Sequence, residues 1–123
     1  MAKRFRIAWL AEPEAHNYPA AHSYLSLLFD AKAVTKYVSR LRAAKVVEFK
    51  SKDIFRASQL SQLGVSNFFV EKDRKKILDG KKLSPILLVR DPANGRVIVA
   101  DGYHRMCSVY SFDEEAPIPC KIV

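Results

Sequence analysis

The sequence predicts a compact α/β protein of the α+β kind, in which helices flank a small mixed sheet and a helical extension precedes it. Two strongly apolar segments, 85–90 and 96–100, are separated by turn-forming residues and predict a pair of strands. A helix-like segment, 103–112, follows the second strand directly. Apolar residues recur at helical spacing in 20–44 and again in 67–78, so both types of element are expected along one chain.

The amino-terminal residues, 1–44, are expected to form a mainly helical extension. An apolar run over 4–10 predicts a short strand, and 11–19 is expected to be irregular because two prolines interrupt it. Asp30 divides the helical stretch that follows, because it can cap a second helix. We expect this extension either to cover the remaining module or to make the contact of a homodimer. Its apolar positions are Tyr24, Leu27, Leu28, Ala31, Val34, Val38 and Leu41.

The remaining residues, 45–123, are expected to form one compact module. The composition of 45–50 is that of a strand, and 51–64 reads as a short helical or looped crossing. The helix over 67–78 is expected to stop at Gly80.

The hairpin over 85–100 is the clearest prediction. Pro92 fixes φ and Gly95 tolerates positive φ, so the turn chemistry agrees with the two apolar strands around it. The helix over 103–112 is followed by a last strand over 118–123. Pro119 lies within that strand and predicts an edge or bulged position, because proline cannot donate to a strand ladder.

The charge of the chain favours anionic partners. It contains 21 Lys and Arg against 13 Asp and Glu, which gives a formal net charge of +8 and an isoelectric point near 9.7. This excess does not distinguish DNA, RNA, a free nucleotide or an acidic protein. The lysine-rich segments also contain acids, so solvated helix faces explain them equally well.

Several function classes are not expected from the composition. No apolar run is long enough to span a membrane and no signal peptide is recognisable, so we expect a cytoplasmic protein without a membrane partner. Cys107 and Cys120 are too few for a disulfide framework and are expected to be buried or half-buried thiols. We expect no metal site, because the acids and histidines of the amino-terminal part match no ligand spacing. These residues are Glu12, Glu14, His16 and His22.

The segment Asp101-Gly102-Tyr103-His104-Arg105 is the strongest candidate for a binding site. A strand that leads through a glycine into a helix points the unpaired N–H groups of that helix at an anion, which the helix dipole also favours. Gly102 would let the anion approach the backbone, and Arg105 could grip phosphate oxygens. The residues alone leave a plain turn open, with Asp101 capping the helix and His104 and Arg105 exposed, because one glycine is a weak signal.

The order of elements, together with the segments 83–90 and 100–105, resembles the ParB/sulfiredoxin superfamily over roughly 45–123. In that superfamily, a proline-led strand ending in Val-Arg is followed by a second strand and a Gly-x-x-Arg helix start. This helix start binds the phosphates of CTP in ParB proteins and of ATP in sulfiredoxins. The resemblance implies that Gly102, His104 and Arg105 contact the phosphates, with Arg90 as a supporting candidate. It also places a helix beside the nucleotide, where Lys72, Lys75 and Lys76 are either phosphate contacts or part of a solvated face. Tyr103 is a further candidate contact, and Ser84 is either a hydroxyl donor to the nucleotide or a turn residue.

The departures from the superfamily pattern narrow what the resemblance implies. Tyr103 stands where sulfiredoxins have their catalytic cysteine, so a sulfinic acid reductase is not expected. His104 replaces the first of two arginines in ParB proteins, and no helix-turn-helix domain is recognisable, which argues against sequence-specific DNA partitioning. The Asp-Gly-x-x-Arg form is similar to a free-serine kinase branch. In such an enzyme Asp101 would orient Mg²⁺ or the acceptor hydroxyl.

Three functional hypotheses follow from the sequence. The first is a protein that binds the phosphates of ATP, ADP or CTP, with nucleotide hydrolysis or small-molecule phosphoryl transfer left open and Mg²⁺ as the cofactor of either reaction. The second is a ParB-like DNA-binding or nuclease-like module, in which the same loop holds a backbone phosphate. The third is a protein-interaction domain without ligand chemistry.

Overall fold

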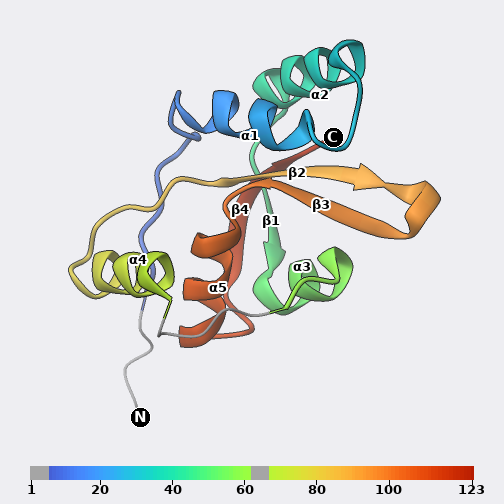
Figure 1. Ribbon diagram of the computed structural model, residues 1–123. Coiled ribbons are helices and arrows are strands. Elements are labelled where there is room, and N and C mark those ends of the chain that lie inside the picture. The colour runs from blue at the N-terminus through green and yellow to red at the C-terminus, as the bar shows by residue number, and fades with distance from the viewer. Residues whose placement is uncertain (1–5, 62–66) are drawn as a thin grey trace.

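A four-stranded mixed sheet forms the centre of the protein, in a computed structural model that describes residues 6–61 and 67–123. The strand order is β1 (Val47–Lys50), β4 (Pro117–Ile122), β2 (Ile86–Asp91) and β3 (Arg96–Asp101). β4 runs parallel to β2, and the outer pairs β1–β4 and β2–β3 are antiparallel. Helices cover both faces of this sheet, as the sequence predicts for an α+β protein (Figure 1).

Strand β2 is buried on both faces and therefore belongs to two apolar cores. Ile86 and Leu88 point into one core, and Leu87 and Val89 into the other. All four side chains are buried. This explains the uninterrupted apolar run in the sequence, because a strand with helices on both sides has no solvent-facing positions.

Helices α1 (Asn17–Leu25) and α2 (Ala31–Ala43) cover one face of the sheet (Figure 1). The Asp30 carboxylate accepts a hydrogen bond from Ala33 N at 2.8 Å and caps α2, as predicted. Leu27 lies between the helices and is 82% exposed, and Tyr24 and Leu28 are also exposed, so these three do not join the core. The buried helix residues on this face are Tyr18, Ala21, Leu25, Val34, Val38 and Leu41.

Helices α3 (Ser51–Ser58), α4 (Phe68–Leu78) and α5 (Tyr103–Phe112) cover the opposite face (Figure 1). The Asn67 side chain accepts hydrogen bonds from Phe69 N and Val70 N and begins α4. The Ser108 hydroxyl donates to the Val70 carbonyl at 2.9 Å and holds α5 against α4. The predicted crossing over 51–64 is helical over its first part, and its last residues, 62–64, lie outside the described residues.

The amino-terminal segment differs from its prediction. Within 6–10 there is a single bridge, Trp9 to Leu83, in place of a strand, and residues 4 and 5 lie outside the described residues. The segment expected to be irregular already contains the first turn of α1. Pro19 is tolerated there because the N–H groups of a first helical turn have no partner within the helix.

The hairpin is confirmed and the position predicted from Pro119 is wrong. A 3-10 turn, Pro92–Asn94, and Gly95 at φ 61° connect β2 to β3. β4 lies inside the sheet, between β1 and β2. Pro119 pairs with β1, whereas the ladder to β2 begins at Cys120, so the missing N–H does not interrupt that ladder. Both cysteines are buried, as predicted.

Candidate functional site

Gly102 forms the bend between β3 and α5 and is required there by packing. Its φ is 114°, and a Cβ atom would lie 2.3 Å from Ile86 Cγ2 and 2.7 Å from Ile86 Cβ. The sequence suggests that glycine stands here to leave room for an anion. The structure gives a different reason for a glycine, because a Cβ atom at this position would point into the core and clash with Ile86.

Asp101 and Arg105 form an ion pair across this bend. Arg105 Nη2 donates to Asp101 Oδ2 at 3.0 Å, and each side chain is 17% exposed. No side chain caps α5, so the alternative in which Asp101 caps this helix is wrong. Arg105 is not simply exposed either, and its Nε is buried without a hydrogen-bond partner among the described residues.

A cavity of about 320 Å³ lies against this bend, and four parts of the chain line it. They are the end of β3, the first turn of α5, one face of α4 and the residue before α1. Such a volume lies at the small end of the range for ligand sites, roughly 300–1,000 Å³. The lining residues are His16, Phe69, Lys72, Asp73, Lys76, Asp101, Gly102, Tyr103, His104 and Arg105.

Helix α4 supplies the wall that sequence reasoning found only in part. Phe69, Asp73 and Lys76 follow one another at spacings of four and three, which places them on the same helix face beside Lys72. The sequence singled out the lysines of this helix, but it gave no role to Phe69 or Asp73. Their helical spacing relative to Lys76 is the signal that could have grouped them.

Positive charges surround Asp73 in the cavity. Burial raises the pKa of this carboxyl group, and nearby charges oppose that effect; they come from Lys76, Arg105, His104 and Lys72. The cavity thus combines three permanent cations and two imidazoles with two carboxylates, of which Asp101 is already paired with Arg105. Lys72 and Lys76 are both exposed and available to an anion.

Aromatic rings form the rim of the cavity around His104. The His104 ring lies 5.0 Å from the Phe69 ring and 5.7 Å from the Tyr103 ring, centre to centre. The Tyr103 hydroxyl donates to the Ser61 carbonyl, and burial raises the pKa of Tyr103. Tyr103 is therefore fixed by the protein, whereas the Phe69 side chain is more than half exposed.

Ser84 and Arg90 are not brought to the cavity. The buried Ser84 hydroxyl donates to Asn17 Oδ1 and accepts from Glu14 N at 3.0 Å. This network fixes the segment that carries His16 to the cavity. Arg90 is exposed and lies three residues along β2 from Leu87, which pairs with Asp101. At 3.3 Å per residue, Arg90 is therefore about 10 Å along the strand from the cavity.

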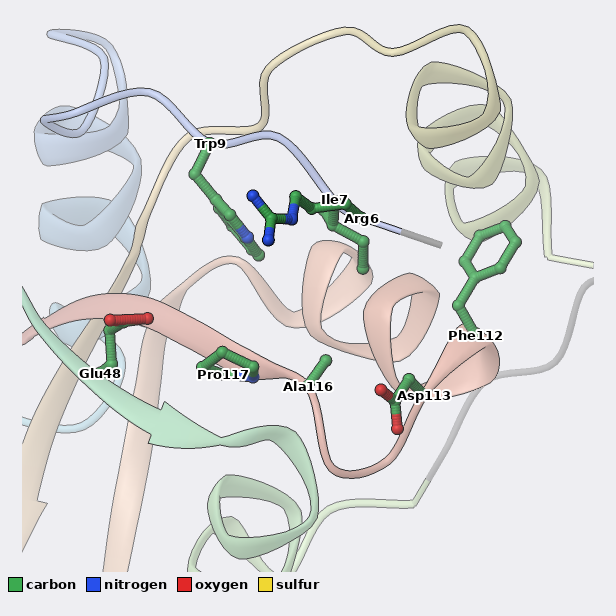
Figure 2. Close-up of a pocket in the computed structure, with 8 residues that line it drawn as sticks. All are labelled: Arg6, Ile7, Trp9, Glu48, Phe112, Asp113, Ala116 and Pro117. Carbon is green, nitrogen blue, oxygen red and sulfur yellow. The ribbon is translucent and has the colours of Figure 1, made fainter. Parts of the chain in front are cut away.

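A second and larger cavity, about 650 Å³, lies at the other end of α5 (Figure 2). Arg6, Ile7 and Trp9 line it from the amino-terminal segment, facing residues of β4 and the end of α5 (Figure 2). None of the site residues predicted from the sequence lies there. The remaining lining residues are Glu48, Phe112, Asp113, Ala116 and Pro117.

Comparison with known protein families, with curated proteins and with solved structures finds no match to this chain. Over residues 6–61 and 67–123, no three His, Cys, Asp or Glu side chains gather closely enough to hold a metal ion. In the same part of the chain, no helix has the length and apolar character to cross a membrane.

Proposed function

We propose that the chain binds a nucleoside triphosphate or diphosphate through its phosphates in the cavity beside Gly102. The observation that supports this proposal is the convergence of Lys72, Lys76 and Arg105 on the uncapped amino terminus of α5. Unpaired N–H groups and the positive end of the helix dipole both favour an anion there. The resemblance of 45–123 to the ParB/sulfiredoxin superfamily leads to the same ligand class.

Each basic group has a separate part in this proposal. Asp101 holds the Arg105 guanidinium through Nη2, which leaves the other terminal nitrogen of the fork for phosphate oxygens. Lys72 and Lys76, from α4, would add two mobile point charges on the other side of the phosphates.

A magnesium-bound nucleotide suits this cavity better than the free nucleotide. Asp73 and Asp101 lie among the cations, and a bare polyphosphate would meet their negative charge. Mg²⁺ lowers the charge of the phosphates and accepts carboxylate oxygens as ligands. Asp101 is the candidate to orient the metal or an acceptor hydroxyl, if hydrolysis or phosphoryl transfer takes place in the cavity.

The test is isothermal titration of ATP, ADP and CTP with Mg²⁺ into the wild type and a Lys72→Ala/Lys76→Ala variant. The variant should bind at least about tenfold more weakly, because two charge-assisted contacts at about 1 kcal/mol each are lost. Lys75→Ala/Lys81→Ala is the matched control, since these exposed lysines lie outside the cavity and should leave affinity unchanged. Arg105→Ala should abolish binding.

The second hypothesis, a DNA-binding or nuclease-like module, predicts a different pattern. Affinity for a DNA duplex would fall steeply with salt because counterions are released, and both lysine pairs would contribute alike. If no nucleotide binds at millimolar concentration while DNA does, the nucleotide proposal is rejected in favour of this alternative. If neither the nucleotides nor DNA bind, the result favours the protein-interaction hypothesis.

A further inference from the structure

Phe69 presents an exposed aromatic ring at the rim of the proposed phosphate cavity. Its side chain is 54% exposed, although it lies one residue before Val70, which is fully buried. The ring contacts Phe68, itself 71% exposed, at 5.3 Å and His104 at 5.0 Å, centre to centre. The exposed Phe68 and Phe69 rings touch and so form one continuous apolar surface, with Phe69 lining the cationic cavity. Contiguous exposed apolar surface, unlike a single exposed residue, is the kind that marks a ligand-binding site.

The position of this ring on α4 matches the arrangement of a nucleotide. Phe69 precedes Lys72 by three residues and Lys76 by seven, and all three line the same cavity. At 1.5 Å per residue, Phe69 and Lys76 are separated by about 10 Å along the helix. That is the scale of the distance between a base and its β-phosphate in an extended nucleotide, so one helix face can contact both ends of the ligand.

We infer that Phe69 is the platform on which the base of the bound nucleotide stacks, and that the site prefers purine over pyrimidine nucleotides. The inference rests on the proposed nucleotide binding and adds the base to it. Every base has a π-face, so stacking accepts all of them, and the larger purine ring overlaps more of the phenyl surface. The Phe68 ring meets Phe69 at 77° and the His104 ring meets it at 39°, and Phe69 remains 54% exposed beside both.

The experiment compares ATP, CTP and inorganic triphosphate, each with Mg²⁺, on the wild type, Phe69→Ala and Phe69→Trp. Removing the ring should weaken ATP binding by about tenfold and leave triphosphate binding within twofold, because triphosphate has no base to stack. The wild type should bind ATP a few-fold more tightly than CTP. Phe69→Trp should retain ATP affinity, and its added indole fluorescence should be quenched by ATP and not by triphosphate.

Leu78→Ala is the matched control, because Leu78 is an exposed apolar residue of the same helix that does not line the cavity. Leu78→Ala should change the affinity for neither ATP nor triphosphate. Equal weakening of ATP and triphosphate by Phe69→Ala would make Phe69 a structural residue and overturn the inference. So would a wild type that binds triphosphate as tightly as ATP, although the phosphate site itself would then stand. A wild type that binds neither ligand overturns both proposals.

Discussion

Replacing Gly102 by alanine tests whether the bend at the candidate site depends on glycine. Two costs add in the variant. A non-glycine residue at φ 114° costs about 1–3 kcal/mol in backbone strain. A methyl group 2.3 Å from Ile86 Cγ2 must displace core atoms, and overpacking of this kind costs about 1–3 kcal/mol. We expect a loss of about 2–6 kcal/mol from a total stability of roughly 5–15 kcal/mol.

Urea denaturation followed by circular dichroism measures this loss, and a thermal scan should show a Tm lowered by at least about 8 °C, at about 4 °C per kcal/mol. Gly95→Ala is the matched control. Gly95 has φ 61°, and nothing lies within 4 Å of the position that its added methyl group would take, so only the backbone cost of about 1–2 kcal/mol applies. A Gly102→Ala variant that is no less stable than Gly95→Ala would show that Ile86 does not require a glycine at this bend.

Two further predictions concern Asp73 in the cavity and the buried thiol of Cys120. Asp73→Asn should bind triphosphate more tightly without magnesium, because it removes a carboxylate from among the cations; equal or weaker binding would contradict this. Burial raises the pKa of Asp73 above 3.8, so the folded state holds that proton more firmly. The free energy of unfolding of the wild type should therefore fall relative to that of Asp73→Asn as pH rises through the raised pKa. At lower pH the two free energies should converge, and urea titrations at several pH values measure both. Burial also raises the pKa of Cys120 to about 12. Iodoacetamide should leave this cysteine unmodified in the native protein and label it in urea, as read by peptide mass mapping, and rapid native labelling would show the thiol to be accessible.

Local chemistry was enough to predict most elements of this fold. Asp30 caps α2, and the Pro92 to Gly95 turn joins β2 to β3, because a cap or a turn is encoded within about four neighbouring residues. The range of α5 also agrees with its prediction, since Gly102 and the helical pattern define its start.

The predictions that are wrong concern features that depend on contacts between segments distant in the sequence. Pro119 predicts an edge or bulged position because proline disfavours a central strand, and the sheet accommodates it inside because β2 pairs with β4 from Cys120 onward. Leu27 continues the apolar spacing of the amino-terminal helices, yet the turn before Asp30 leaves it exposed. Sequence spacing does not contain the strand order or the angle between two helices.

Some residues of the candidate site are likewise predictable from the local sequence, and others are not. The glycine bend and the place of Arg105 in the first turn of α5 follow from the amino-acid sequence alone, because these features lie within five consecutive residues. Folding of distant segments brings Phe69, Asp73, Lys76 and His16 to the same cavity. The packing of α4 against α5 and the Ser84 network on the segment before α1 bring these side chains together. Contacts between segments distant in the chain depend on which faces the sheet buries, and that is settled only when the whole core forms.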